Sequence, residues 1–239
     1  MLQRIDKILS SQEICTRKQA KELCKAGQVL VDGIPVKKVE QKVDPDQSEI
    51  TVSGKPLVFR KFLYLMMNKP KGVVSASRDS STPTVVDLVP DPLRRQGLFP
   101  AGRLDKDTTG FVLLTDDGEF AHRILSPRNH VPKTYHAVVS GTVDESVIHA
   151  FEKGMVLADG SQCKCAQLRI LKCEEDLTTT EVILREGMYH QIKRMFAACG
   201  CHVEELHRVK IGGMSLDEKL APGECREILY KELKEILTY

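Results

Sequence analysis

The chain has 239 residues, of which 41% are hydrophobic and 28% charged, a composition typical of a globular protein. Its formal net charge is only +2, so any attraction to a polyanion must come from local clusters of charge. No run of about eighteen apolar residues is present, and the N-terminal residues lack the apolar core of a signal peptide. These features exclude a membrane-spanning protein, and we expect a cytoplasmic location.

The first 60 residues look like a separate module and are more basic than the rest, with 11 Lys and Arg against 8 Asp and Glu. Thr16 and Gln19 have the spacing of a capping box, and Gly27 is a typical stop, which predicts a helix over 17–26. Such a basic helix face is usually only solvated, so its meaning depends on the segments that follow. The basic residues on one side of this helix are Arg17, Lys18, Lys21 and Lys25.

A hairpin and a further strand follow this helix. Asp32-Gly33 between two short apolar runs is a strong hairpin signal, and Pro35 places the second strand at a sheet edge. Ile50-Thr51-Val52 is predicted to be another short strand. The order of basic helix, hairpin and strand resembles an S4 RNA-binding domain. The resemblance implies that residues 1–58 bind RNA and that the basic helix face contacts it.

Residues 59–239 are predicted to form a larger domain of mixed helices and strands. Strands are expected at 62–67, 111–114, 133–140, 166–171 and 179–185. Helices are expected at 119–125, 144–153, 189–199 and over the last dozen residues, with Pro127, Gly154 and Gly200 as stops of the first three. We therefore expect an α+β protein, in which a small S4-type domain precedes a domain with a mixed, largely antiparallel sheet.

Asp105 is the most informative candidate for chemistry. It lies in the glycine-bracketed run Gly102-Arg-Leu-Asp-Lys-Asp-Thr-Thr-Gly110, just before an apolar strand that Asp116-Asp117-Gly118 ends. A carboxylate in this place is held on a rigid support, as nucleophilic or acid–base chemistry requires. The alternative is a loop aspartate that caps a backbone turn, which is the more common case on physical grounds alone.

The run from 102 to 118 resembles the active-site signature of the RsuA/RluB group of RNA pseudouridine synthases, GRLD-x-D-T-x-G followed by an apolar run and T-[DN]-D-G. Asn68-Lys69-Pro70-Lys71-Gly72 is similar to the first motif of this family, N-K-P-x-G. The resemblance implies that Asp105 is the catalytic aspartate. It also implies that Arg103 fills the place that the flipped target base leaves; otherwise Arg103 contacts a phosphate or forms a local salt bridge.

The segment 185–196, Arg-Glu-Gly-Met-Tyr-His-Gln-Ile-Lys-Arg-Met-Phe, is a second signature. On the predicted helix, His190, Lys193 and Arg194 share one face and form a basic stripe, which without context is most often solvated. H-Q-[IV]-[KR]-R-M resembles the third synthase motif, which supplies a basic residue to the catalytic aspartate. The resemblance implies that Lys193 is this residue, with Arg194 as the alternative.

Lys133-Thr134-Tyr135 is similar to the second synthase motif, whose tyrosine stacks beside the target base. The resemblance implies that Tyr135 stacks beside the uracil. Because the reaction must also remove the proton from C5 of the re-attached base, we expect Tyr135 to assist that step. The other interpretation is an ordinary core tyrosine with a satisfied hydroxyl. Tyr135, Ala137 and Val139 are predicted to share one face of the strand.

The cysteines suggest a zinc site as an alternative, because Cys163 and Cys165 are close in sequence, as are Cys199, Cys201 and His202. Their spacing does not match the common structural zinc sites, so we expect reduced thiols, no metal and no cofactor. A metal-dependent nuclease is another alternative, because paired acids can hold Mg²⁺. Its acids would be Asp105, Asp107, Asp116 and Asp117.

The two resemblances cover nearly the whole chain and imply one function, site-specific isomerisation of uridine to pseudouridine in ribosomal RNA. Segments within 203–226 are similar to the small-subunit (16S) branch, with a large-subunit (23S) synthase of the same group as the alternative. A non-catalytic S4-type factor of ribosome assembly is a third interpretation. We expect ribosomal RNA or a pre-ribosomal particle as the partner, no contact with a membrane, and a monomer.

Overall fold

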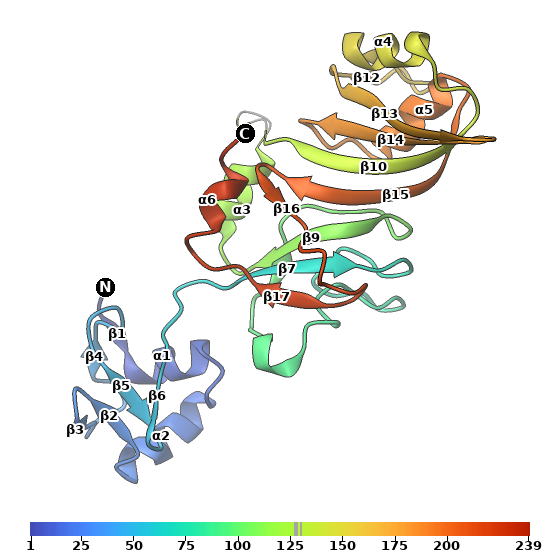
Figure 1. Cartoon of the computed structure of the whole chain (residues 1–239). Helices are drawn as coiled ribbons and strands as arrows, with labels where there is room; N and C mark the ends of the chain where they lie inside the picture. Colours follow the sequence, from blue (N-terminus) through green and yellow to red (C-terminus); the bar gives the residue numbers. More distant parts are fainter. Residues whose placement is uncertain (127–128, 130) are drawn as a thin grey trace. The chain divides into compact units, whose positions relative to one another are not determined.

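The computed structural model describes residues 1–126, 129 and 131–239 (Figure 1). The chain forms two compact units, one of residues 1–63 with 94–97 and the other of residues 64–93 with 98–239. Within the described residues, neither unit contains a helix long and apolar enough to cross a membrane.

The N-terminal unit packs two helices against short strands in the order β3-β2-β5-β6, and β1 pairs separately with β4. The predicted helix is confirmed as α2 (Arg17–Lys25), and its capping box is present. Thr16 Oγ1 accepts a hydrogen bond from the Gln19 amide at 3.2 Å, and Gln19 Oε1 accepts one from the Thr16 amide at 2.8 Å. The sequence patterns did not indicate α1. The other elements are β1 (Gln3–Arg4), α1 (Ile5–Ser11), β2 (Val29–Val31), β3 (Ile34–Pro35), β4 (Lys42–Val43), β5 (Ile50–Val52) and β6 (Lys55–Pro56).

The predicted hairpin between β2 and β3 is confirmed. Asp32 and Gly33 have φ of +50° and +79°, the left-handed values that a tight two-residue hairpin turn requires. Pro35 lies in β3, an edge strand, where its missing N–H costs no ladder hydrogen bond. The core beneath the sheet is apolar and includes Ile5, Ile8, Leu9, Ala20 and Val29.

The second unit is built on one long sheet in the order β13-β14-β10-β15-β9-β7-β17 (Figure 1). Its pairings are antiparallel except at the centre, where β15 and β9 run parallel. The five predicted strands are confirmed as β7, β9, β10, β13 and β14, whereas the sequence patterns did not indicate β15. The strands of this path are β7 (Tyr64–Lys69), β9 (Thr109–Thr115), β10 (Lys133–Ser140), β13 (Gln167–Glu174), β14 (Leu177–Leu184), β15 (His202–Ile211) and β17 (Cys225–Glu227).

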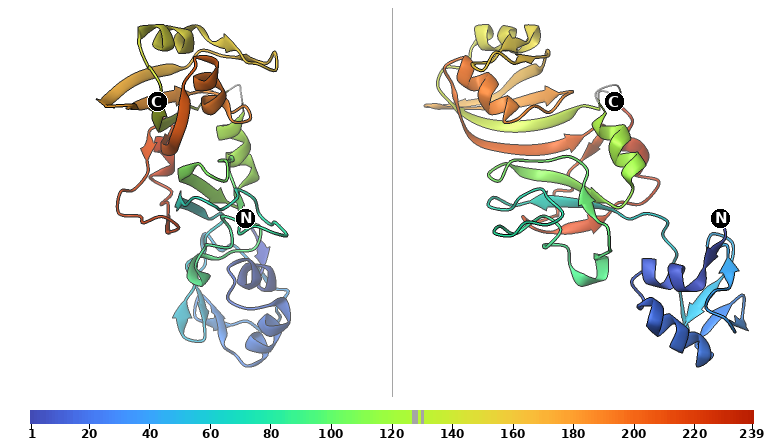
Figure 2. Two further views of the ribbon diagram at one scale, coloured as in Figure 1. Left: turned by 90° about the vertical axis from the view of Figure 1, so that its right-hand side faces the viewer. Right: turned by 180° about the vertical axis from the view of Figure 1, so that it is seen from behind.

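Helix α4 (Glu145–Lys153) packs against β13, and helix α5 (Gln191–Ala198) packs against β15 (Figure 2). Phe151 of α4 and Phe196 of α5 meet in the core with ring centroids 4.8 Å apart. On β10, Ala137 and Val139 face this core with Tyr135 packed against it, as the alternation predicted.

Two helix predictions need correction. The helix predicted from 189 begins only at Gln191, because His190 has a left-handed φ of +47°, which helical residues do not adopt. The last dozen residues form only the short α6 (Leu233–Ile236), since Ile228 still continues the sheet and donates to the Tyr64 carbonyl at 2.8 Å. The predicted helix 119–125 is present as α3 (Gly118–Leu125), while its expected stop, Pro127, lies outside the described residues.

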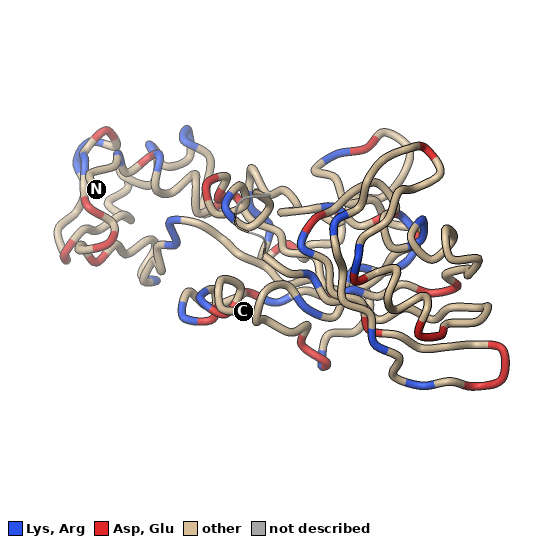
Figure 3. Tube along the Cα trace, turned by 90° about the horizontal axis from the view of Figure 1, so that it is seen from above, with Lys and Arg blue, Asp and Glu red and all other residues tan. Residues whose placement is uncertain are grey.

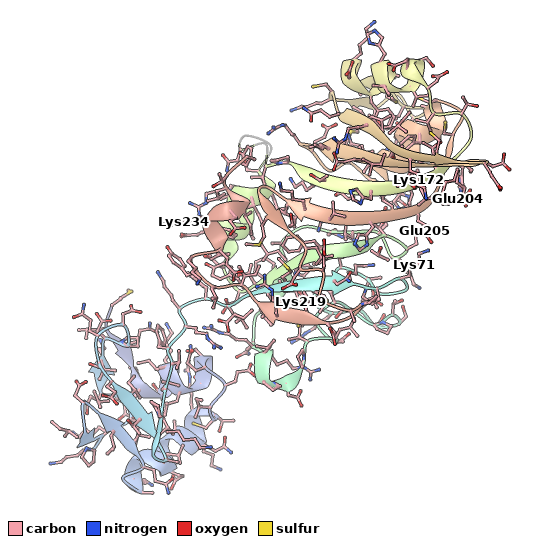
Figure 4. All side chains as sticks on the ribbon, in the orientation of Figure 1. Lys71, Lys172, Glu204, Glu205, Lys219 and Lys234 are labelled. Atoms are coloured by element: carbon pink, nitrogen blue, oxygen red, sulfur yellow. The ribbon has the colours of Figure 1, made fainter. Side chains whose placement is uncertain are left out.

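Gly110 is required where β9 meets β15. It has φ of +100°, and a Cβ at this position would lie 2.4 Å from the Arg208 carbonyl oxygen and 2.7 Å from the Arg208 nitrogen. Lys71 and Glu205, labelled in Figure 4, form an ion pair between the segment after β7 and β15, with Nζ 3.6 Å from Oε1. Both of these side chains are exposed, so their ion pair adds little to the stability.

Gly110→Ala is expected to lower the free energy of unfolding by about 3 kcal/mol or more, because the new Cβ must displace backbone and not a flexible side chain. Urea unfolding followed by circular dichroism measures this change. Gly118→Ala is the matched control, since its Cβ would meet nothing within 4 Å. A Gly110→Ala variant as stable as the wild type would contradict this account of the central strand pair.

Candidate active site

The loop that carries Asp105 lies between β8 (Phe99–Pro100) and β9 and is fixed by hydrogen bonds. Ser75 Oγ donates to the Leu104 carbonyl and accepts from the Leu104 amide, both at 3.1 Å. The Thr108 amide donates to the Asp105 carbonyl oxygen at 3.2 Å. In the described part of the chain, the Asp105 carboxylate accepts no backbone hydrogen bond, and it is 28% exposed. It therefore does not act as a turn cap and remains accessible.

Lys69, the last residue of β7, supports the same loop from within the protein. Its buried ammonium donates to the carbonyl oxygens of Pro70 at 3.1 Å, Lys106 at 3.2 Å and Thr108 at 2.7 Å. Burial lowers the pKa of Lys69 to about 8, while the two carboxylates of the loop act in the opposite direction. The N-K-P-x-G segment is thereby linked to the loop of Asp105.

A cleft of about 80 Å³ opens beside Asp105. It brings together Arg103, Asp105, Tyr135 and His190, which the sequence predicted from three separate segments. Charged and aromatic groups thus share the cleft with apolar walls, an arrangement that can hold a planar base next to a carboxylate. The apolar lining consists of Leu104, Leu184, Met188, Ile192 and Leu206.

Among the described residues, His190 is the group that forms an ion pair with Asp105 when its imidazole is protonated, with Nε2 3.5 Å from Oδ1. The His190 ring stacks on Tyr189 with a centroid distance of 3.9 Å and an interplanar angle of 16°. Left-handed backbone at a residue other than glycine is uncommon and occurs preferentially at functional sites. The conformation of His190 at the start of α5 directs its ring to the carboxylate.

The structure corrects the predicted partner of Lys193. Lys193 Nζ lies 2.5 Å from Asp107 Oδ2, not on Asp105, and this hydrogen bond holds the pKa of Asp107 below its usual range. The physical reason is the turn at Lys106 and Asp107, which presents the second carboxylate of the loop to α5. Arg194, the alternative, binds Asp159 at 2.5 Å and is not on Asp105 either.

Arg208 contacts Tyr135 of the cleft, and the sequence patterns did not indicate it. It pairs across the strands with Tyr135, is 3% exposed, and donates from Nη1 to Tyr135 Oη at 3.4 Å. Its Nε donates to the Phe111 carbonyl oxygen at 2.7 Å. An arginine on the inward face of a strand would have indicated this residue. That face can be identified only when residues 202–211 are known to form β15.

The basic face of α2 is exposed, as the sequence predicted. Lys25 forms an ion pair with Glu22 of the same helix, at 3.4 Å between Nζ and Oε1. Figure 3 shows basic and acidic positions interleaved along both units, so local clusters and not overall charge distinguish the surfaces. The exposed basic residues of α2 are Arg17, Lys18, Lys21 and Lys25.

The aspartates and cysteines that could have held a metal ion have structural surroundings instead. Asp117 caps α3 by accepting from the Phe120 amide at 3.0 Å, and it accepts a hydrogen bond from the Tyr64 hydroxyl at 2.6 Å. Cys163 is buried, whereas Cys165 is exposed. Across residues 1–126, 129 and 131–239, no group of three or more His, Cys, Asp or Glu side chains is arranged to hold a metal ion.

Comparisons with protein families and with individual proteins agree on one family. The RNA pseudouridylate synthase family matches residues 63–198, and the S4 domain matches residues 3–48. The RNA pseudouridine synthase YtzG of Bacillus subtilis is 47% identical over 230 residues, 96% of each chain. The ribosomal small subunit pseudouridine synthase A of Escherichia coli is 39% identical over 236 residues, 98% of this chain and 100% of that relative.

A solved structure also matches over nearly the full length. The crystal structure of a pseudouridylate synthase has a TM-score of 0.67 and 38% sequence identity, covering 98% of this chain and 99% of that chain. The family resemblance seen in residues 102–118 and 185–196 is thereby confirmed. The chain belongs to the RNA pseudouridylate synthase family with an S4 domain, and it is an isomerase that forms pseudouridine from uridine.

Proposed function

We propose that the chain isomerises a specific uridine of ribosomal RNA, in the small-subunit 16S rRNA. The observation that carries this proposal is the cleft in which Asp105, Tyr135 and His190 converge from a loop, a strand and the start of a helix. The name of the Escherichia coli relative, a ribosomal small subunit synthase, supports the choice of RNA. A large-subunit 23S synthase of the same group is the alternative.

The proposed reaction breaks the bond between N1 of uracil and C1′ of ribose, turns the base, and joins C5 to C1′. The target base must leave its stack to reach the cleft, because its atoms are inaccessible inside a helix. Asp105 is the carboxylate that acts at the ribose or the base. Exposed Arg103 beside it fills the place of the flipped base or contacts a phosphate.

The remaining groups, in the cleft and around it, hold the base and fix the loop of Asp105. Tyr135 stacks on the uracil and assists removal of the C5 proton after the base has been re-attached. Lys193 acts on Asp105 through Asp107, since both carboxylates belong to one loop. His190 contacts Asp105 directly, and Arg194 fixes the rim by donating to the Tyr189 carbonyl at 3.1 Å. In this proposal His190 and Arg194 both lie next to the bound RNA.

We infer further that residues 1–58 act as the RNA-binding domain and residues 59–239 as the catalytic domain. The S4 match over residues 3–48 and the exposed basic face of α2 support this division. The partner is ribosomal RNA or a pre-ribosomal particle, which places the protein in the cytoplasm. We also propose a monomer, in which Asp105, Tyr135 and His190 of one chain form the cleft.

Replacing the four basic residues of α2 by alanine is expected to raise the half-saturating RNA concentration about tenfold or more and to flatten its salt dependence, because phosphate contacts supply much of RNA affinity. The rate at saturating RNA is expected to persist, since the cleft lies in the other unit. Single-turnover rates against RNA concentration at two salt concentrations measure both effects. The substituted residues are Arg17, Lys18, Lys21 and Lys25.

A variant with four other lysines of the same unit replaced by alanine is the control for net charge. A similar loss in this control would show that charge alone, and not the α2 face, attracts the RNA. A collapsed saturating rate in the folded α2 variant would show that the N-terminal unit helps to build the active site. The exposed control lysines are Lys37, Lys38, Lys42 and Lys55.

The target is tested with purified protein, 16S and 23S rRNA transcripts and small-subunit precursor particles, with and without EDTA. We expect pseudouridine at one position of 16S rRNA or its particle, with a yield that EDTA does not change. Modification of 23S rRNA alone would favour the alternative target. Binding without isomerisation would indicate an assembly factor, and EDTA-sensitive cleavage would indicate a nuclease.

A further inference from the structure

Arg208 is a buried cation whose surroundings leave it incompletely paired. It is 3% exposed, and within the described residues no carboxylate forms an ion pair with it. Nε and Nη1 donate to Phe111 O and Tyr135 Oη, while Nη2 has no hydrogen-bond partner in the described part of the chain. The guanidinium carbon lies 5.9 Å from the centroid of the Tyr135 ring.

Stability alone does not account for an arginine at this position. A buried charge with one unpaired donor opposes folding, and an apolar side chain of similar volume would fill the space at lower cost. The neighbourhood adds further positive charge, because Lys69 is fully buried and Lys133 lies nearby. Burial first, and then the charge of Arg208, lowers the pKa of Lys133 to about 8. The incomplete pairing of Arg208 therefore points to a role in the site besides its structural bond to Phe111.

We propose that Arg208 is a positioning residue that holds the phenol of Tyr135 in the cleft, so that Oη faces C5 of the re-attached uracil. The inference rests on the role proposed above for Tyr135. Arg208 and Tyr135 are direct cross-strand partners on β15 and β10, so the guanidinium reaches the hydroxyl across the strand pair. The Nη1–H···Oη bond fixes one direction at the phenol oxygen and leaves the other free for the substrate.

The step that needs this alignment is the loss of the C5 proton. After C5 has joined C1′, C5 carries both its hydrogen and the ribose, and N1 is doubly bonded to C6. Tyr135 Oη takes the C5 proton as its own hydroxyl proton passes to water, and the C5–H electron pair forms the C5=C6 bond. The N1=C6 pair moves to N1, which takes the proton that water received from Tyr135, so Tyr135 ends as the neutral phenol. The charged donor of Arg208 stabilises the partial negative charge on Tyr135 Oη while the hydroxyl proton is being lost.

A double-mutant cycle on single-turnover rates at saturating rRNA tests the proposal. Arg208→Met is expected to slow isomerisation by about 10- to 100-fold, because a small misplacement of a catalytic group costs this much. In a Tyr135→Phe background, the same substitution is expected to change the rate less than about threefold, since the hydroxyl through which Arg208 acts is already absent. Equal losses in the two backgrounds would overturn the proposal.

A second measurement separates positioning from a general loss of structure. With rRNA deuterated at C5 of uridine, Arg208→Met is expected to raise the primary isotope effect, because proton removal becomes rate-limiting. Arg208→Lys keeps a charged donor and should regain part of the rate; Arg208→Gln, which keeps a neutral donor, replaces Arg208→Met if the latter does not fold. An unchanged isotope effect in the folded variant would overturn the role of Arg208.

Arg226→Met is the matched control. Arg226 belongs to the same sheet and binds Asp217 and Glu232, at 2.7 Å and 3.2 Å. We expect this control to lose stability and to keep the wild-type isotope effect, and a raised effect in the control would count against the proposal. A wild-type protein without activity on any rRNA would contradict the proposed function itself, whereas an active wild type with an additive cycle contradicts only the role of Arg208.

Discussion

Asp105→Asn is expected to abolish pseudouridine formation while RNA binding persists. Asparagine has nearly the same shape, and the bond from the Thr108 amide to the carbonyl of residue 105 does not involve the carboxylate. The substitution thus removes a charged oxygen without opening the loop. We expect a single-turnover rate at least about a thousandfold below wild type, the size of effect seen when a central catalytic group is lost. Pseudouridine is quantified after digestion, and binding is measured by filter retention.

Asp79→Asn is the matched control for this experiment. Asp79 is an exposed acid of the same unit whose carboxylate accepts from the amides of Ser81 and Thr82 in a turn. Its replacement should weaken that turn and leave isomerisation near the wild-type rate. Retention of more than a few per cent of activity by Asp105→Asn would refute the catalytic assignment of this carboxylate.

Lys193→Met is expected to lower the single-turnover rate by about 100-fold, because the loop of the catalytic carboxylate loses both its tie to α5 and the positive charge that pairs with Asp107. Lys193 Nζ lies 2.5 Å from Asp107, so the ammonium both ties the loop to α5 and places a positive charge on the loop that carries Asp105. Lys193→Arg keeps the charge and should remain partly active. The rates are measured at saturating RNA, so a loss of affinity does not enter the comparison.

Asp107→Asn separates the two contributions of Lys193. A loss equal to that of Lys193→Met would show that the tie to the loop is what matters, whereas a small loss would favour the charge itself. Arg194→Met is the comparison for the alternative assignment, and we expect a smaller effect because Arg194 binds Asp159. An inactive Arg194→Met beside an active Lys193→Met would exchange the two roles.

Signals that depend on near neighbours predicted much of what positions the site. The capping box of α2, the Asp32-Gly33 turn and the alternation along β10 are each fixed by residues a few positions apart. Asp105 could be identified for the same reason, since glycines and an apolar strand border it in the sequence. The shared cleft of Asp105, Tyr135 and His190 followed only from the family resemblance.

Features that depend on contacts between residues far apart in the sequence could not be predicted. The partner of Lys193 depends on which carboxylate of the loop faces α5, and no local pattern contains that information. Charged residues such as Glu204 and Glu205 interrupt the alternation of apolar and polar residues along β15. The sequence pattern therefore does not indicate that Arg208 is buried. The C-terminal residues have a helical pattern, but pairing of Ile228 with β7 takes precedence over their propensity.

The parallel pair of β9 and β15 determines when in folding the site can first exist. Thr109 Oγ1 lies 2.7 Å from His207 Nδ1 although 98 residues separate them, whereas β13 and β14 are joined by a short turn. Contacts between residues so far apart in sequence form slowly, because the loop-closure entropy must be lost before they form. Asp105 lies in the loop just before β9, whereas Tyr135 lies on β10, in the half of the sheet that contains β15. Recovery of isomerase activity during refolding should therefore lag behind recovery of secondary structure and report the closure of the sheet.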